Sequence, residues 1–326
     1  MDRLSGADFS ELEALCSGGV VRGAKLSEIS QWRIGGLADI MLCPASTAEV
    51  AAIQRWFATR GIRPVVIGHT SNLLFDDEGL RVPCIHVGAR LSEVIFHDAT
   101  VKAQAGVWVP FLARRIMLAG LSGAEHICGI PGTLGGLICM NGGSQRKGIG
   151  SSLLWVESVD AEGVIHRRTG EDCGFGYRRS KFQTNGEIST SARLRMLVRP
   201  TDQIRSEMRR ILKDRRVKFP RKEPNCGSVF KSNPEMYSEI GPPGAVIERL
   251  GFKGLRVGGA QVSTRHANFI VNNGGATARD VLSLISCIVE SVEALTGYRM
   301  ESEVRYVHST GDILPADLVE LGRAYE

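Results

Sequence analysis

Two short loops of the sequence carry the small residues that can bind phosphate groups. The first, Gly68-His-Thr-Ser-Asn72, follows an apolar run at 64–67, and the second, Gly129-Ile-Pro-Gly-Thr-Leu-Gly-Gly136, holds four glycines around Thr133. Glycine-rich backbone can present several N–H groups to one anion, although each stretch is also typical of a plain tight turn. The second loop is not the Gly-x-Gly-x-x-Gly of a Rossmann fold. Two such loops in one chain favour a diphosphate ligand over two unrelated turns.

A single serine stands where a loop returns to apolar residues. The stretch from Asn225 to Pro234 reads NCGSVFKSNP, so Ser228 lies between Gly227 and the apolar pair Val229–Phe230. This pattern is typical of a loop that ends at the serine and enters a short strand. The alternative is that the turn holds one hydroxyl at a fixed point for chemistry. The local sequence leaves both interpretations open.

The elements around the first loop alternate between helix and strand. Ser46 and Glu49 have the spacing of a capping box, apolar residues follow at helical spacing, and Gly61 ends that helix. The run 64–67 then predicts a buried strand whose carboxyl end leads into the loop at 68–72, a usual ligand position in α/β structure. Short strands are predicted between 153 and 198, and helices over 107–120, 201–216 and 277–295, the last with an apolar face that includes Leu295.

Composition indicates an ordinary globular protein. The chain has 326 residues, 43% hydrophobic and 23% charged, with a formal net charge of +5, enough length for two or three domains. Basic residues gather between Arg205 and Arg216, on a predicted amphipathic helix. A solvated basic face is the simpler interpretation, and a docking site for an anionic substrate is the alternative. Nucleic acid is not expected as a partner, because no aromatic residues interleave with these charges.

The cysteines and the hydropathy pattern indicate a cytoplasmic protein. Eight cysteines are scattered without Cys-x-x-Cys spacing, which argues against a structural metal site and indicates reduced thiols. The first residues show no apolar signal-peptide core, and no apolar run approaches the length of a membrane span. We therefore expect neither a metal nor a membrane partner.

Seven motifs in register resemble one enzyme family. They are WRIGGLAD (32–39), the loop 68–72 with its continuation to Gly79, GIPGTLGGLICMN (129–141), FGYRRS (175–180), NCGSVFK (225–231), GGAQVSTRHANFIVN (258–272) and ESEVR (301–305). Across about residues 20–307 the chain resembles UDP-N-acetylenolpyruvoylglucosamine reductase, the flavoenzyme that forms UDP-N-acetylmuramate for peptidoglycan. The short segment between Asn233 and the GAVIERLGFKG motif at 244–254 is similar to the shorter subtype of the family, which lacks an extra tyrosine-bearing loop.

The resemblance implies an α+β fold with FAD and NADPH as cofactors. It implies a bipartite FAD-binding fold of the vanillyl-alcohol-oxidase type, with subdomains at 1–86 and 87–200, and a substrate-binding domain with a C-terminal tail at 201–326. It implies a UDP-sugar enolpyruvyl substrate and a nicotinamide dinucleotide as ligands, and we expect a monomer. The implied cofactor contacts are Gly68, His69, Thr70, Ser71, Asn72, Gly129, Ile130, Pro131, Gly132, Thr133, Gly135 and Gly136.

The same resemblance implies catalytic roles for Arg178, Ser228 and Glu303. The enol-ether carboxylate gains negative charge when hydride adds to the vinyl carbon, and a guanidinium can stabilise that charge. A serine hydroxyl can then protonate the carbanion-like carbon 2, while Glu303 orients the carboxylate end or holds a second proton. Tyr177, Lys218, Asn233 and His266 are the implied substrate contacts; His266 is as readily a packed structural histidine.

Some segments depart from the family pattern, so two alternatives stay open. His69 and Thr70 stand where glycine is more usual, and the segment at 141–148 replaces an alanine-rich one. The alternatives are a paralogue that reduces a related enolpyruvyl or nucleotide sugar, and a flavin-binding protein without catalysis. Retention of all three catalytic residues argues against the second.

Overall fold

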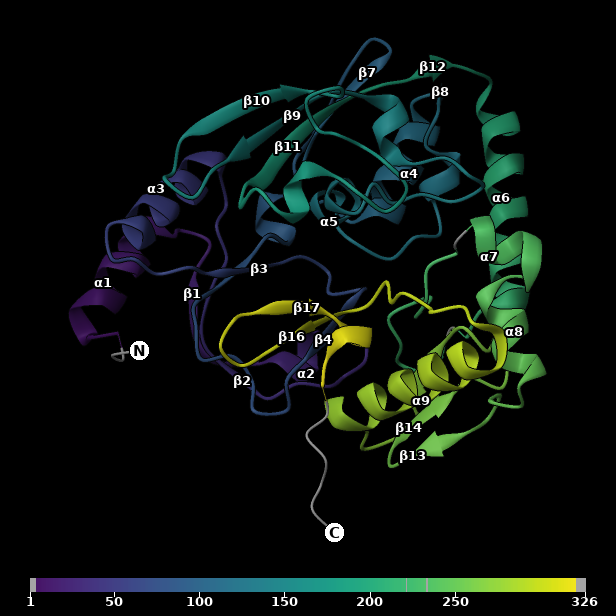
Figure 1. The fold of residues 1–326 in the computed structure, drawn as a ribbon. Helices are drawn as coiled ribbons and strands as arrows, with labels where there is room; N and C mark the ends of the chain where they lie inside the picture. Colours follow the sequence, from purple (N-terminus) through teal and green to yellow (C-terminus); the bar gives the residue numbers. More distant parts are fainter. Residues whose placement is uncertain (1–3, 221, 233, 321–326) are drawn as a thin grey trace. The chain divides into compact units, whose positions relative to one another are not determined.

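The computed structural model describes residues 4–220, 222–232 and 234–320, which form two compact units (Figure 1). The first unit comprises residues 1–22, 40–69 and 83–215, and the second comprises 23–39, 70–82 and 216–326. Each unit is therefore assembled from three separate stretches of chain. The three predicted domains are consecutive segments of the chain, whereas each unit combines segments that are separate in the sequence. The predicted domain boundaries remain a proposal.

The first unit is built around a five-stranded antiparallel sheet in the order β10-β9-β11-β7-β6. Helix α5 packs against β11 and β7, while α3 packs against β9 and β11. A smaller sheet has the order β1-β2-β5-β3, and β12 pairs with β8. The elements are α1 (Gly6–Leu15), β1 (Val20–Lys25), β2 (Leu37–Leu42), α3 (Thr47–Ala58), β3 (Val65–Ile67), β5 (Cys84–His86), β6 (Val94–His97), β7 (Thr100–Gln104), α4 (Val109–Leu118), β8 (Leu121–Ser122), α5 (Leu134–Cys139), β9 (Leu153–Val159), β10 (Ile165–Thr169), β11 (Ile188–Arg195), β12 (Leu197–Val198) and α6 (Thr201–Lys218).

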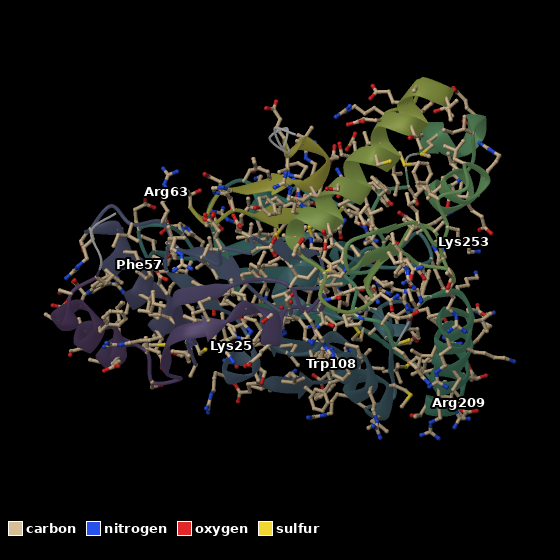
Figure 2. The ribbon with its side chains drawn as sticks, turned by 90° about the horizontal axis from the view of Figure 1, so that it is seen from below. Lys25, Phe57, Arg63, Trp108, Arg209 and Lys253 are labelled. Atoms are coloured by element: carbon tan, nitrogen blue, oxygen red, sulfur yellow. The ribbon has the colours of Figure 1, made fainter. Side chains whose placement is uncertain are left out.

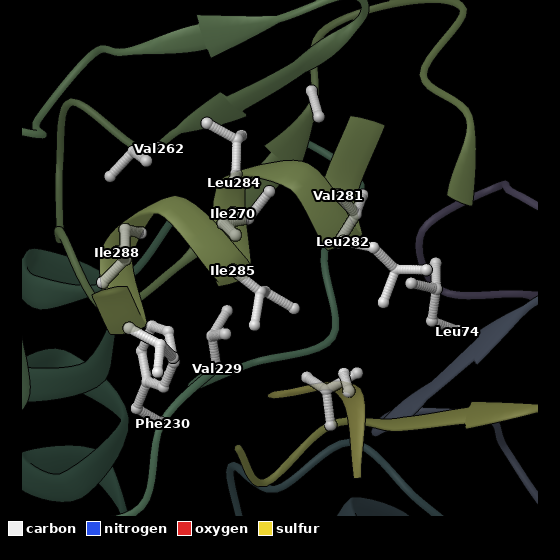
Figure 3. Packing of buried hydrophobic residues seen from close by; sticks show 14 of the residues in the cluster. Leu74, Val229, Phe230, Val262, Ile270, Val281, Leu282, Leu284, Ile285 and Ile288 are labelled. Carbon is white, nitrogen blue, oxygen red and sulfur yellow. The ribbon is translucent and has the colours of Figure 1, made fainter. Parts of the chain in front are cut away.

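The second unit packs helix α9 on two three-stranded sheets. Their orders are β13-β14-β15 and β17-β16-β4, and β16 runs parallel to β4. Its core is apolar and includes Val281, Leu284, Ile285 and Ile288 of α9 with Val229 and Phe230 of the serine motif (Figure 3). The elements are α2 (Leu26–Ile29), β4 (Leu73–Phe75), α7 (Pro234–Glu239), α8 (Pro243–Arg249), β13 (Arg256–Val257), β14 (Ala260–Val262), β15 (Ile270–Asn272), α9 (Ala278–Thr296), β16 (Arg305–Val307) and β17 (Ile313–Pro315).

Most predicted helices and strands are confirmed within a few residues. The Ser46 side chain caps α3 by accepting from Glu49 N–H at 3.1 Å, but the Glu49 carboxylate accepts from Ala45 N–H instead of completing the capping box. The predicted strand at 64–67 is β3, and α9 ends at Gly297 in a left-handed conformation. Leu295 is 69% exposed, so its assignment to the apolar face was wrong.

Candidate functional site

The two glycine loops approach each other within the first unit. A Cβ atom on Gly68 would lie 2.4 Å from Oγ1 of Thr133. Because real Cβ contacts are never that short, only glycine permits this approach. The Thr133 side chain also accepts from Gly136 N–H at 3.4 Å and so caps the short helix α5. Gly68 and the second loop are therefore assembled at one place.

Few N–H groups of the second loop are left for a ligand. The Leu134 and Gly135 N–H groups donate to carbonyl oxygens of the segment before α4, at 3.0 and 2.7 Å. Within the part of the chain that the structure describes, the N–H groups of Gly132 and Thr133 make no hydrogen bond. A phosphate or another acceptor could use these two N–H groups.

His69 adds a buried polar atom to this place. Its Nδ1 atom is buried and has no hydrogen-bond partner among the described residues. Burial lowers the pKa of His69, which keeps the imidazole neutral near pH 7. An orphaned buried nitrogen beside a glycine approach is the environment expected for a polar group of a bound cofactor. These residues fit a dinucleotide such as FAD.

Thr70, Ser71 and Asn72 belong to the second unit. Thr70 is buried with a φ of +55°, and its hydroxyl donates to the Ile29 carbonyl at 2.9 Å and accepts from Gln31 N–H at 3.3 Å. The Asn72 carbonyl accepts from the backbone N–H that begins β16. The Thr70 hydroxyl is thus engaged within the protein, and its predicted cofactor role remains a proposal.

Arg178 stands at the tip of a tight turn in the first unit. Gly176 and Arg179 form a bridge around Tyr177 and Arg178, and Arg178 has a φ of +53°. Its side chain is half-buried, while Tyr177 is 62% exposed. A non-glycine residue at positive φ is strained, which is common where a functional side chain must be held in place.

The Arg178 turn is held by two side-chain amides. Asn141 donates to the Gly176 carbonyl at 2.8 Å, and Gln183 donates to the Arg178 carbonyl at 2.9 Å. Asn141 also accepts from Gly150 N–H at 3.0 Å. The altered segment at 141–148 therefore begins with a residue that braces the guanidinium-bearing turn.

Ser228 follows a turn that two asparagines fix in the second unit. Asn225 Oδ1 accepts from Gly227 N–H at 2.9 Å, and Gly227 has a φ of +81° that favours glycine. After the serine, Asn268 Oδ1 accepts from Phe230 N–H at 2.9 Å and its Nδ2 donates to the Phe230 carbonyl at 3.0 Å. Among the described residues of this stretch, only Phe230 forms a bridge, with Ser302, so the strand interpretation reduces to one pair.

Glu303 lies on the segment that pairs with the serine motif. Its N–H donates to the Val229 carbonyl at 2.7 Å, so the serine and the carboxylate stand on two hydrogen-bonded segments of the second unit. Glu303 is half-buried, whereas Glu301 is exposed and pairs with Lys231 at 2.8 Å. The two neighbouring carboxylates therefore have different environments.

His266 has the contacts of a packed histidine. Its ring lies 5.3 Å from the Phe219 ring and 5.1 Å from the Phe269 ring. Its Nδ1 accepts from Asn268 N–H at 3.2 Å, and burial lowers the pKa of His266. Lys218 is exposed at the end of α6, and its positive charge adds to the effect of burial by lowering the pKa of His266 further.

Asn233, the remaining predicted substrate contact, lies outside the described residues. Among those that are described, no cluster of histidine, cysteine and carboxylate side chains has the arrangement of a metal site. Nor does any helix in these residues have the length and apolar character of a membrane span.

Sequence reasoning gave no role to Asn268 or Arg215. Asn268 lies within the motif at 258–272. Its side chain braces Phe230, which is distant in the sequence, so no local pattern predicts this role. Arg215 was included in the solvated basic face, and for this residue that prediction was wrong, because its stem packs on Gly129. Its spacing from the buried Met208 and Ile211 places it on the same helical face, a signal that was available.

Two family models match the chain. The FAD binding domain model matches residues 38–169, and the UDP-N-acetylenolpyruvoylglucosamine reductase C-terminal domain model matches residues 219–307. The UDP-N-acetylenolpyruvoylglucosamine reductase 1 of Corynebacterium glutamicum is 44% identical over 293 residues, which cover 89% of this chain and 87% of that protein. The corresponding reductase of Heliobacterium modesticaldum is 40% identical over 286 residues, or 88% of this chain and 90% of that protein.

A solved structure has the same fold over most of the chain. The crystal structure of UDP-N-acetylenolpyruvylglucosamine reductase from Thermus caldophilus superposes with a TM-score of 0.74 at 31% identity. The superposition covers 88% of this chain and 98% of that one.

Proposed function

This chain belongs to the UDP-N-acetylenolpyruvoylglucosamine reductase family, and we propose that Arg178, Ser228 and Glu303 carry its reaction. It is an FAD-dependent oxidoreductase that reduces UDP-N-acetylglucosamine enolpyruvate in peptidoglycan precursor synthesis, with NADPH as the reductant. Bound FAD supplies the hydride for this reduction.

The observation that carries the proposed roles is the pairing of the serine and glutamate segments. The Glu303 N–H donates to the Val229 carbonyl at 2.7 Å, directly after Ser228. The Ser228 hydroxyl makes no hydrogen bond in the described part of the chain, so it is available to donate a proton to carbon 2 of the substrate. Glu303, on the paired segment, orients the carboxylate end or holds a second proton.

Arg178 is proposed to bind the substrate carboxylate. Its turn is fixed by two amide hydrogen bonds and its φ is positive, so its backbone is placed before any ligand arrives. A preorganised guanidinium stabilises charge that develops on a carboxylate without further rearrangement. Tyr177, which is exposed beside it, is proposed to contact the nucleotide sugar together with Lys218 and Asn233.

The cofactor residues are proposed from the glycine loops. We propose that Gly68, His69 and the loop from Gly129 to Gly136 contact FAD. In support, the N–H groups of Gly132 and Thr133 and the Nδ1 atom of His69 make no hydrogen bond among the described residues. We assign His266 to packing in preference to substrate contact, because the one described hydrogen bond of its ring is to its own loop. We further propose a monomer that works in the cytoplasm, which sedimentation of the purified protein and fractionation of cells would test.

The test is NADPH oxidation by the purified yellow protein with and without the enolpyruvyl substrate. We expect oxidation that depends on UDP-N-acetylglucosamine enolpyruvate and product that carries the lactyl ether. A flavoprotein that stays inert toward this substrate, but is reoxidised by another enolpyruvyl sugar, would overturn the substrate assignment.

A further inference from the structure

Arg215 of helix α6 is packed directly against the second glycine loop. A Cβ atom on Gly129 would lie 2.6 Å from Cδ and 2.7 Å from Nε of Arg215. Gly129 does not have a positive φ, so its glycine is required by the space that the arginine occupies and not by its backbone conformation. The loop and the arginine side chain are thus fitted to each other.

Arg215 is half-buried, and its charge interacts with that of Arg178. Burial lowers the pKa of Arg215, and the positive charge of Arg178 lowers it further. Arg215 nonetheless stays charged near neutral pH, because guanidinium pKa values lie far above 7. Two positive charges that interact in a partly desolvated region of the first unit attract an anion more strongly than either charge alone.

We propose that Arg215 is a second guanidinium for the enolpyruvyl carboxylate and acts on the same anion as Arg178. This inference rests on the proposed role of Arg178. Arg209, an exposed basic residue of the same helix, faces solvent (Figure 2). Within one helix, the structure therefore separates one ligand-directed arginine from a solvated basic face.

The variants for the test are Arg215→Gln, Arg215→Lys and Gly129→Ala, with Arg209→Gln as the matched control on the exposed face of the same helix. Arg215→Gln removes the charge, and Gly129→Ala displaces the charge without removing it. Each variant is first checked for its FAD content and its circular dichroism. Arg215→Lys, the conservative change, keeps the test open if the glutamine variant does not fold.

Two ligands separate the carboxylate from the diphosphate as the anion. UDP-N-acetylglucosamine enolpyruvate carries both groups, whereas UDP-N-acetylglucosamine carries only the diphosphate. We expect Arg215→Gln to weaken binding of the enolpyruvyl ligand roughly 10- to 100-fold, the range for a charged hydrogen bond, and to leave binding of UDP-N-acetylglucosamine unchanged. Gly129→Ala should act in the same direction, Arg215→Lys should lose less, and Arg209→Gln should lose nothing. Reduction of the flavin by NADPH should keep its rate in Arg209→Gln and, because the substrate carboxylate takes no part in this step, in both Arg215 variants.

The inference is overturned by an equal loss for both ligands, which would assign Arg215 to the diphosphate. It is also overturned if the Arg215 variants lose FAD but bind the enolpyruvyl ligand normally once FAD is restored. Unchanged binding of the enolpyruvyl ligand in every variant would overturn it as well. Coupling between Arg178→Lys and Arg215→Gln in a double-mutant cycle supports a shared anion, and strict additivity contradicts it. The role of Arg178 fails separately, if Arg178→Lys alone leaves binding and turnover unchanged.

Discussion

The replacement Ser228→Ala separates the two half-reactions of this enzyme. The Ser228 side chain is half-buried and its hydroxyl makes no hydrogen bond in the described part of the chain, so its removal breaks no contact there. The turn before it is held by Asn225 and Gly227, and the segment after it by Asn268. We therefore expect a change in unfolding free energy within about 0.5 kcal/mol.

The expected kinetic effect is much larger than the effect on stability. Reduction of FAD by NADPH does not use the serine proton and should keep its rate. Reoxidation by the enolpyruvyl substrate needs that proton and should slow by roughly 10²–10⁴-fold, the range for a positioned general acid. This corresponds to about 3–5 kcal/mol of barrier. The effect on stability is small and the effect on reoxidation is large because the Ser228 hydroxyl makes no hydrogen bond in the described part of the chain.

Stopped-flow traces at the flavin absorbance measure the two rates in one instrument. Ser228→Cys is the informative companion, because a thiol still donates a proton and should restore part of the reoxidation rate. If Ser228→Ala reoxidises as fast as the parent, the serine is only a turn residue. Equal slowing of both half-reactions would also refute the argument, because it would indicate a displaced cofactor.

Three further outcomes are expected. Arg178→Lys should lower kcat more than it raises KM in steady-state assays, because lysine keeps the charge but loses the forked geometry that the developing enediolate needs; a raised KM alone would show a ground-state anchor. FAD should be released by acid precipitation, since we expect no covalent bond to His69 despite its position in the first loop, and colour that stays in the pellet would contradict this. Asn268→Ala should lower the unfolding free energy by about 2–4 kcal/mol in urea titrations, because it leaves the N–H and carbonyl of Phe230 buried and unpaired, whereas the exposed Asn273→Ala should have little effect.

Local signals allowed the regular elements to be predicted. Ser46 and Gly297 mark helix ends through their own side chain or conformation, and the apolar spacing of α9 names most of its buried face. Leu295 has the correct spacing for the buried face, but it lies in the last turn of α9 and is 69% exposed. Periodicity predicts the direction of a side chain, whereas tertiary packing decides whether that side chain is buried.

The candidate site was less accessible to local reasoning. The resemblance of the motifs named Arg178, Ser228 and Glu303, but no pattern around Arg178 predicts a positive φ. Arg215 was assigned to solvent because charge runs usually lie there, and the Gly129 backbone that receives it is far away in the sequence. Contacts between residues far apart in the sequence depend on the fold, so sequence spacing alone does not predict them.

The turns that bear Arg178 and Ser228 share one construction. Each has a positive φ, at Arg178 and at Gly227, and in each a side-chain amide braces irregular backbone beside a single bridge pair. An asparagine carries both a donor and an acceptor, so it can satisfy an N–H and a carbonyl that a turn leaves unpaired. Regular strands would satisfy the same groups but would direct alternate side chains to opposite faces. Amide-braced turns instead let one guanidinium or one hydroxyl stand alone, which is what stabilisation of a single carboxylate and protonation of a single carbon require.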